Sequence, residues 1–486
     1  MQRFLVKDAA KHIGETVKVQ GWVNTVRSHG RVLFIDIRDM SSAMQCVFVP
    51  SQQETYEKAK ELRPEYVIEI VGQIIKRPEN MVNENIETGK VEMAVQSLDI
   101  LVKAETLPLS IEESGYEIGE ETRMKYRFLD LRRARLKRNF IVRHKVTNFV
   151  RNFFTNEGFI EIETPMLTKS TPEGARDFVV PSRIHPGKFY ALPQSPQQYK
   201  QLLMVAGFEK YFQIARCLRD EDPRGDRQAE HTQIDAEMSF IEREDFMELY
   251  ERMLINLVKF LFPEKKIQEI PFPRISYQEA IQKYKTDRPD LRNDKEDKNL
   301  LAFCWVIDFP FFEKTDEGGW TFTHNPFSAP KPEFMADLLA KKNIGQIITT
   351  QYDIALNGWE IGGGSIRNHN PEALEKVFEI MGYEKEEIYH KFGHMINAFK
   401  YGAPPHGGIG SGLDRIVALL LNEPNIREVI AFPKTGDGRD LMMDFPSEIS
   451  KEQLEELHIH TDKEKKAVQL KVKKTSKKNA KPKKNT

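Results

Sequence analysis

Five short segments of alternating polar and apolar residues near the N-terminus constrain the fold of this chain more than any other feature. A period of two places successive side chains on opposite faces of a strand, which is the pattern of a half-buried sheet. One helical stretch lies between the third and fourth segments. The segments are residues 16–23, 31–38, 43–49, 66–72 and 91–95, and the helical stretch is 52–62.

Five strands with a helix after the third is the order of an OB-fold, a small barrel that commonly binds single-stranded nucleic acid. The sequence therefore predicts such a domain over residues 1–105. Phe34 shares a strand face with the polar residues Asp36 and Arg38. We therefore expect its ring to be an exposed platform on which an unpaired base can stack.

The rest of the chain predicts a larger domain of a different class. Residues 106–138 are charged and arginine-rich, and we interpret them as a linker or hinge. From 139 the pattern becomes helical, and it then mixes strands and helices up to about residue 450. The economical interpretation is an α+β domain with an antiparallel sheet flanked by helices. Residues 451–486 form a C-terminal extension.

Composition narrows the cellular context. The three cysteines are isolated, which argues against a disulfide framework and fits a reducing compartment. No apolar run approaches the roughly 20 residues that a membrane span requires, so we expect a cytoplasmic protein with no membrane partner. Residues 463–486 carry eleven lysines and one glutamate. This tail is expected to be disordered, either as a solubilising appendage or as a tether for a phosphate backbone.

Arginines occur in segments that suit phosphate binding. Arg219 ends one strand, and after a loop a second strand follows over 230–240, so that both can face one pocket. In the segment 410–415, glycines lead directly into an apolar helix, which places Arg415 beside helix N-terminal amides. An arginine suits a phosphate because its donors are fixed, bidentate and always charged.

Together these segments resemble the class II aminoacyl-tRNA synthetases. Residues 159–165 look like motif 1, which builds the dimer interface in that family, residues 219–240 look like motif 2, and residues 412–415 look like motif 3. The preceding barrel is similar to the Asp/Asn/Lys branch. The segments that match the aspartyl-tRNA synthetases of bacterial type are 171–178, 194–200, 219–222, 233–237, 362–367 and 430–434.

The resemblance implies a homodimeric ligase that uses ATP and Mg²⁺ to activate L-aspartate and transfers it to the 3′-end of tRNA-Asp. One alternative is an asparaginyl-tRNA synthetase, which is disfavoured by Lys200 and Arg367 as cations for a side-chain carboxylate. A second is an asparagine-synthetase-like ligase on the same fold, which would not need a base-contacting barrel. A third is an inactive tRNA-binding paralogue, which should have lost Arg219, Glu360 or Arg415.

The resemblance also implies roles for individual residues. Catalysis is assigned to two arginines, Arg219 on the α-phosphate and Arg415 on the γ-phosphate. The residues expected to bind aspartate are Glu173, Gln197, Lys200, Asp235, His324 and Arg367. Those expected at ATP are Arg219, Asp220, Glu221, Gln228, His231, Glu360, Gly412, Leu413, Asp414 and Arg415, with Asp353 and Glu360 as ligands of Mg²⁺. Those expected at the anticodon are Arg27, His29, Phe34, Gln45, Arg77, Asn80 and Glu92.

The sequence departs from the family pattern at several positions. The domain usually inserted into the catalytic domain is reduced to about residues 290–301. His231 stands where the family usually has a phenylalanine over adenine. In the barrel, His29 matches the form that also aspartylates tRNA-Asn, whereas Asn80 is neither the glycine of that form nor the lysine of the strict form. We favour relaxed specificity, since histidine can donate to either pyrimidine carbonyl.

Overall fold

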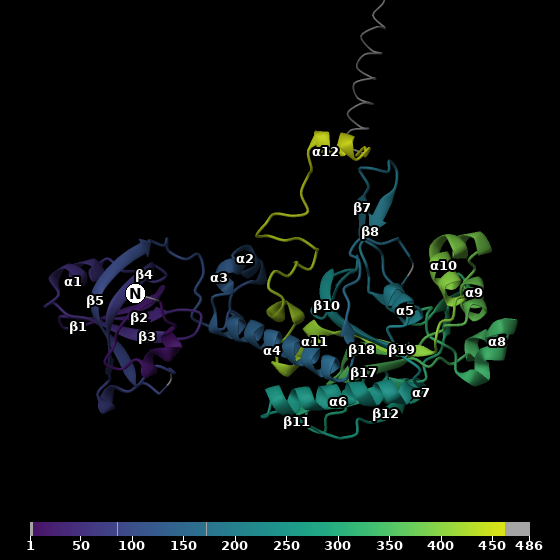
Figure 1. Cartoon of the computed structure of the whole chain (residues 1–486), viewed down its shortest axis with the longest axis horizontal. Helices are drawn as coiled ribbons and strands as arrows, with labels where there is room; N and C mark the ends of the chain where they lie inside the picture. The colour runs from purple at the N-terminus through teal and green to yellow at the C-terminus, as the bar shows by residue number, and fades with distance from the viewer. Residues whose placement is uncertain (1–2, 85, 172, 462–486) are drawn as a thin grey trace, which may run out of the picture. The chain divides into compact units, whose positions relative to one another are not determined.

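The computed structural model describes residues 3–84, 86–171 and 173–461, so the lysine-rich tail lies outside the described residues. The chain divides into two compact units, Met1–Pro108 and Leu109–Thr486 (Figure 1). Among the helices of the described part, none has the length and apolar character to cross a membrane.

The first unit is a closed five-stranded barrel with the strand order β1-β2-β3-β5-β4. The helix follows the third strand, so the expected OB-fold is confirmed. The elements are η1 (Val6–Lys11), β1 (Thr16–His29), β2 (Val32–Arg38), β3 (Ala43–Phe48), α1 (Gln53–Lys60), β4 (Val67–Lys76), η2 (Glu79–Met81) and β5 (Val91–Val102).

Alternation along β2 separates the barrel core from its outer face. Leu33, Ile35 and Ile37 are buried in the barrel core, whereas Phe34 and its polar neighbours are partly exposed. Phe34 therefore lies on the outer face of the barrel, as the sequence predicts.

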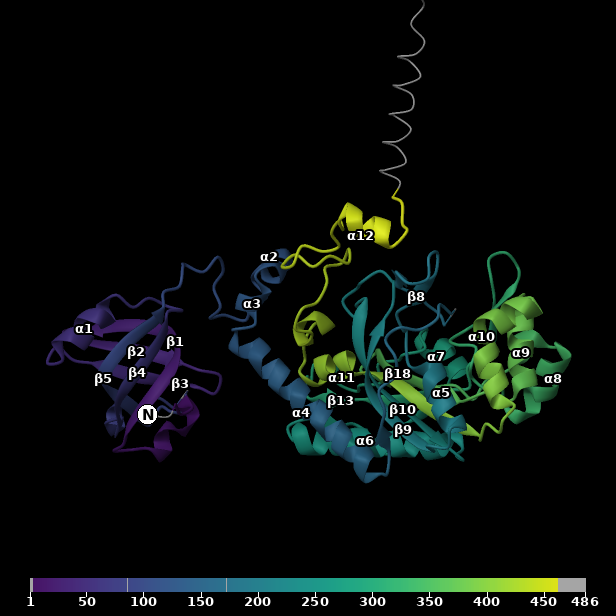
Figure 2. The same cartoon turned by 45° about the horizontal axis from the view of Figure 1, so that its top comes forward.

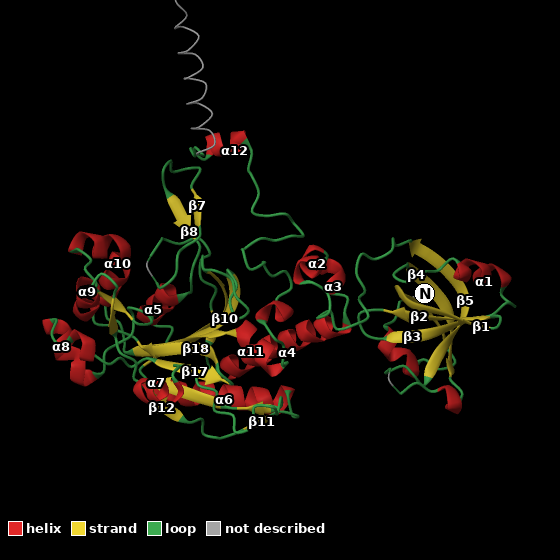
Figure 3. Cartoon of the chain, turned by 180° about the vertical axis from the view of Figure 1, so that it is seen from behind, coloured by secondary structure: helices red, strands yellow, loops and turns green. Residues whose placement is uncertain are grey.

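The second unit is built on a large sheet, whose strands are yellow in Figure 3. The sheet has eight strands in the order β12-β14-β17-β18-β19-β10-β9-β6. Its central pairs are antiparallel, but the edge pairs β12–β14 and β6–β9 are parallel, so the sheet is mixed rather than purely antiparallel. The strands are β6 (Ile160–Glu161), β9 (Lys210–Leu218), β10 (Glu230–Ser239), β12 (Arg274–Ser276), β14 (Phe303–Ile307), β17 (Tyr352–Leu356), β18 (Trp359–Ile366) and β19 (His406–Gly412).

The two faces of this sheet differ in chemistry, as β10 illustrates. Ile234 and Ala236 join the main apolar core, together with side chains from α4 (Ala134–Asn156), α6 (Arg243–Leu261) and α11 (Leu413–Leu420). Because side chains alternate along a strand, Gln233, Asp235 and Glu237 point to the opposite face. The sheet therefore covers an apolar core with one face and presents buried polar groups on the other.

Further elements surround this polar face. Figure 2 shows a helical group of α8, α9 and α10 beside α5. The remaining elements are β7 (Val179–Pro181), β8 (Phe189–Ala191), α5 (Gln197–Val205), β11 (Lys266–Ile267), α7 (Tyr277–Tyr284), β13 (Leu300–Leu301), β15 (Phe312–Lys314), β16 (Trp320–Phe322), η3 (Pro332–Phe334), α8 (Met335–Ala340), η4 (Ile344–Gln346), α9 (Pro371–Ile380), α10 (Lys385–Phe399), η5 (Ile426–Val429) and α12 (Lys451–Glu456). Residues 285–299, close to the expected remnant of an insertion, contain no helix or strand.

The segment expected to be a linker over 106–138 differs from that expectation. From Leu109 onward it belongs to the second unit. It contains α2 (Glu120–Lys125) and α3 (Arg127–Asp130), and α4 begins at Ala134 rather than at residue 139. The arginine-rich composition suggested a linker, but Arg123, Arg127, Asp130 and Arg133 are buried and form ion pairs.

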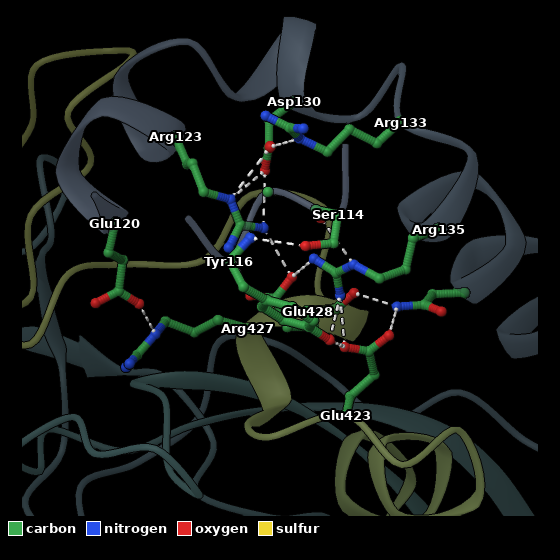
Figure 4. A network of polar contacts seen from close by, with 12 residues as sticks. Ser114, Tyr116, Glu120, Arg123, Asp130, Arg133, Arg135, Glu423, Arg427 and Glu428 are labelled. Atoms are coloured by element: carbon green, nitrogen blue, oxygen red, sulfur yellow. Dashed lines mark hydrogen bonds and ion pairs between the residues drawn. The ribbon is translucent and has the colours of Figure 1, made fainter. Parts of the chain in front are cut away.

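Figure 4 shows Arg123, Arg133 and Arg135 of this segment with the carboxylates of Asp130, Glu423 and Glu428. Arg123 donates to both oxygens of Glu428 at 2.9 and 2.8 Å. Asp130 is fully buried and accepts from Arg123, Arg127 and Arg133, and Arg135 donates to Glu428 at 2.8 Å. This network connects α2, α3 and α4 to residues some 300 positions later in the chain.

The network predicts an acid-sensitive contribution to stability. Burial alone would raise the pKa of Glu428, but hydrogen bonds and charge from Arg123 and Arg135 lower it below its ordinary value of 4.5. A lowered pKa stabilises the fold above the unfolded value, and that stabilisation is lost as pH falls through the folded value. We expect Glu428→Gln to lower the free energy of unfolding by about 2 kcal/mol at pH 7, and by less below pH 4.5. Denaturant unfolding of both proteins across this range measures the difference, and an equal loss at every pH would contradict it.

Candidate active site

A cavity of about 400 Å³ opens on the polar face of the large sheet, within the size range of small-molecule sites. Most residues expected to bind aspartate, ATP or Mg²⁺ line it. They are Glu173, Gln197, Lys200, Arg219, Glu221, Gln228, His231, Asp235, His324, Asp353, Glu360, Arg367, Gly412, Asp414 and Arg415. Asp220 and Leu413 are not brought to the cavity: Asp220 lies 3.8 Å from Arg176, and Leu413 is buried in the apolar core.

Two buried cations in the cavity wall share one carboxylate. The Arg367 guanidinium donates to both oxygens of Glu237, from Nε at 2.8 Å and from Nη2 at 3.1 Å. Lys200 Nζ lies 3.2 Å from Glu237 and donates to Asp235 at 2.9 Å. All four side chains are at most about 3% exposed. Burial alone would raise the pKa of Glu237, but Arg367 and Lys200 lower it to about 2.

Glu237 is a residue that sequence reasoning missed. The signal was present, because Gln233, Asp235 and Glu237 alternate along β10 and so share a face. Two acceptors on this face, Gln233 Oε1 and Asp235 Oδ1, are buried and have no hydrogen-bond partner among the residues that the structure describes. Buried polar atoms are normally paired, so these two are suited to a donor on a bound ligand, such as an ammonium group.

Two arginines approach Asp226, which also lines the cavity, and a third arginine lines the same cavity. Arg415 donates from Nε to the Asp226 carbonyl at 3.1 Å and from Nη1 to the Glu360 carbonyl at 2.7 Å, and its Nη2 is 3.5 Å from the Asp226 carboxylate. Arg288 also approaches this carboxylate, at 3.6 Å. Arg219, at the end of β9, lines the same cavity. This arrangement of fixed guanidinium groups can bind a polyphosphate.

Asp226 and Arg288 were not predicted either. Arg288 belongs to residues 285–299, where the sequence shows charge without periodicity, so nothing in the pattern marks it as close to the cavity. Asp414, by contrast, was expected and lines the cavity. It also holds neighbouring elements together. Its carboxylate pairs with Arg143 of α4 and accepts from the backbone N–H of Thr232 at 2.8 Å.

Asp353 and Glu360 are the expected metal ligands, and both line the cavity. Burial and the nearby Glu360 charge raise the pKa of Asp353 to about 7, with His324 acting in the opposite direction. Gly363 makes room for this carboxylate, since a Cβ there would lie 2.6 Å from Asp353 Oδ1. A divalent cation at these two carboxylates would offset the effect of the Glu360 charge on Asp353. In the described part of the chain, no group of three or more potential ligands is placed to hold a metal, so Mg²⁺ would also need phosphate oxygens.

His231 and Gln228 line the cavity near the arginines. Burial, together with the charges of Arg219 and Arg415, lowers the pKa of His231 to about 3. The imidazole is therefore neutral near pH 7, which suits stacking on a base. Gln228 accepts from the backbone N–H of Lys434 at 2.7 Å, which ties the motif 2 loop to the residues after η5.

In the barrel, four of the residues expected at the anticodon form one polar network around Phe34. Arg27 pairs with Asp36 at 2.8 Å and Gln45 donates to Glu92 at 2.8 Å. The other two contacts in the network are Arg27 to Gln45 at 3.4 Å and Arg77 to Glu92 at 3.5 Å. Phe34 is the register partner of Arg27. His29, at the end of β1, and Asn80, in η2, are exposed.

Comparisons with known families agree with this combination of barrel and cavity. Residues 119–436 match the family model for tRNA synthetases class II (D, K and N), and residues 17–101 match the model for the OB-fold nucleic acid binding domain. The chain belongs to the class II tRNA synthetases of this D, K and N group.

Within that group, the chain is similar to proteins named aspartate–tRNA(Asp/Asn) ligase. The protein of Caldanaerobacter subterraneus is 41% identical, with 93% of this chain and 97% of the relative covered. That of Rubrobacter xylanophilus is 38% identical, with 93% and 95% covered. The first alignment spans 578 positions, more than the 486 residues of this chain, so the relative has residues that this chain lacks.

Solved structures share the fold. The asparaginyl-tRNA synthetase from Pyrococcus horikoshii, complexed with asparaginyl-adenylate, has a TM-score of 0.72 at 22% identity, covering 90% of this chain and 98% of that one. A putative aspartyl-tRNA synthetase from Leishmania major has a TM-score of 0.72 at 19% identity, covering 89% and 94%.

Proposed function

We propose that the chain is an aspartate–tRNA ligase, which forms aspartyl-adenylate from L-aspartate and ATP and transfers the aspartyl group to the 3′-end of tRNA. The observation that carries the proposal is the pair of buried cations, Lys200 and Arg367, next to unpartnered acceptors on Gln233 and Asp235. Aspartate has two carboxylates and one ammonium, which these groups complement. The names of the similar ligases support the same substrate.

The chemistry follows from positioning and charge. The α-carboxylate of aspartate is already ionised and attacks the α-phosphorus in line, so no general base is needed. We assign Arg219 to the α-phosphate and Arg415 to the γ-phosphate, where each stabilises charge that develops as pyrophosphate leaves. His231 would stack on adenine. Asp353 and Glu360 would hold Mg²⁺, which neutralises phosphate charge when it is bound.

The decisive experiment is pyrophosphate exchange with each amino acid in turn, followed by charging of purified tRNA. We expect exchange that depends on L-aspartate and not on L-asparagine. Exchange with asparagine would favour an asparaginyl-tRNA synthetase, and aspartate-dependent exchange without tRNA charging would favour the asparagine-synthetase-like ligase. No exchange with either amino acid would contradict all three enzymes.

tRNA specificity depends on a few side chains of the barrel. The anticodons of tRNA-Asp and tRNA-Asn differ at one letter, and we infer from His29 and Asn80 that both tRNAs are charged. We expect aspartylation of tRNA-Asn and tRNA-Asp transcripts to differ by less than about 100-fold in kcat/KM, or about 2.7 kcal/mol. A larger preference for tRNA-Asp would contradict relaxed specificity. Heterologous tRNA-Lys transcripts, which we expect the enzyme not to aspartylate, serve as the negative control.

We also propose a homodimer that acts in the cytoplasm. Ile160 of the edge strand β6 is 49% exposed and Phe260 of α6 is 75% exposed, and α4 contacts both of these elements. Phe260 packs against Phe149 of α4 at a ring distance of 6.0 Å. An unpaired strand edge next to apolar side chains suits a second copy of the chain. The three buried free cysteines fit a reducing compartment.

A further inference from the structure

Glu173 lines the cavity and accepts hydrogen bonds from Gln198, from Thr171 and, at 3.5 Å, from Ser195. Gln198 of α5 donates from Nε2 to Glu173 and to Thr171 Oγ1, the latter at 2.8 Å. Thr171 in turn donates to Glu173 at 3.0 Å. Burial raises the pKa of Glu173, while the hydrogen bonds from Gln198 and Thr171 oppose that rise. These donors therefore favour the ionised form that an ammonium ligand requires.

The other end of the Gln198 amide faces α10. Gln198 Oε1 lies 2.7 Å from His394 Nε2. An ionised carboxylate only accepts hydrogen bonds, so the amide NH₂ must face Glu173 and the carbonyl must face His394. His394 must then donate from Nε2. Burial and the charge of Lys169 lower the pKa of His394, which favours the neutral ring. In the neutral ring, this contact selects the Nε2–H tautomer.

The helices that carry these two residues also pack against each other. α10 buries Phe392 and Ile396 in an apolar cluster with α9, and Val205 of α5 packs on that cluster. Apolar packing therefore fixes α10 next to α5. One hydrogen bond from His394 sets the orientation of the Gln198 amide.

We propose that His394 is a positioning residue for amino-acid binding: through Gln198, it holds the carboxylate of Glu173 toward the substrate ammonium. The proposal rests on the function proposed above and adds to it a residue outside the cavity. The donated hydrogen bond keeps the amide from rotating, because a rotated amide would turn its carbonyl oxygen toward the Glu173 carboxylate. We therefore expect the hydrogen bond from His394 to increase the affinity for aspartate and to leave the affinity for ATP unchanged.

The test is aspartate-dependent pyrophosphate exchange in His394→Ala. We expect the KM for aspartate to rise about fivefold, with the KM for ATP and kcat within about twofold, as for loss of one hydrogen bond to a positioned group. His394→Gln, whose amide can donate toward Gln198, should restore most of the affinity. The matched control is His390→Ala on the same helix, because His390 contributes its backbone carbonyl, and not its ring, to the contact with Lys169.

A double-mutant cycle separates positioning from general packing. If His394 acts through Gln198, His394→Ala should add less than about 1.5-fold to the KM for aspartate in a Gln198→Leu background. Multiplicative effects, equal changes in both KM values, or no change in His394→Ala would each overturn the proposal. Failure of the proposed function would appear instead in the wild-type protein, as exchange that does not respond to aspartate.

Discussion

Replacing Arg219 or Arg415 by alanine is expected to reduce aspartate-dependent pyrophosphate exchange by at least about 100-fold while the protein stays folded. Each guanidinium is positioned before substrate binds, Arg219 at the end of β9 and Arg415 in the first turn of α11. Loss of one preorganised donor to a developing charge costs roughly 3–4 kcal/mol. Pyrophosphate exchange in the steady state and adenylate formation in a single turnover measure the effect on the chemical step.

The matched control for this experiment is Arg216 of β9, the strand that directly precedes Arg219. Arg216 is exposed and pairs with Glu230 at 2.6 Å, so Arg216→Ala should leave exchange within about threefold of the wild type. Thermal unfolding establishes that each variant is folded. Exchange near the wild-type rate in either Arg219→Ala or Arg415→Ala would refute the assignment of adenylate formation to this cavity.

Local patterns in the sequence predicted those features that depend on short-range periodicity. The barrel follows from strand alternation, and the predicted helix lies after its third strand, at α1. Arg219 and Arg415 were identified because a strand end and a helix start are visible in sequence, and the sheet brings both to one cavity. Such features depend on neighbours a few residues apart, which a single sequence displays directly.

Other features depend on partners far apart in the chain, and these were missed. The segment that contains Arg123 was interpreted as a linker because its partner Glu428 lies about 300 residues later, and no pattern near Arg123 indicates that contact. Arg288 comes from an aperiodic segment, and only the folded chain brings it to Asp226. Glu237 was missed for a different reason. The resemblance assigns its partner Arg367 to the substrate carboxylate, so nothing in the sequence indicates that Arg367 also pairs with a carboxylate of the protein.

The shared counter-ion makes Arg367 the most informative position for amino-acid selection. Arg367→Leu should raise the KM for aspartate by at least about 100-fold and the KM for ATP by less than about threefold, because it removes a desolvated cation that faces the substrate carboxylate. Lys200→Met should act in the same direction. Both variants also leave the buried Glu237 carboxylate short of a partner, so the free energy of unfolding should fall by about 3 kcal/mol.

The loss of aspartate affinity and the loss of stability can be separated by a second substitution. Glu237 is part of the protein and can be replaced, whereas the substrate carboxylate is unchanged. In the double variant Arg367→Leu/Glu237→Gln, the uncompensated buried charge is gone, so stability should recover toward the wild-type value. Aspartate affinity should stay low, since the cation for the substrate is still absent. Recovery of aspartate affinity in the double variant would mean that Arg367 serves only to neutralise Glu237, and that selection of the side-chain carboxylate rests elsewhere. These outcomes are distinguished by denaturant unfolding and aspartate-dependent exchange on four proteins. The four are the wild type, Arg367→Leu, Glu237→Gln and the double variant.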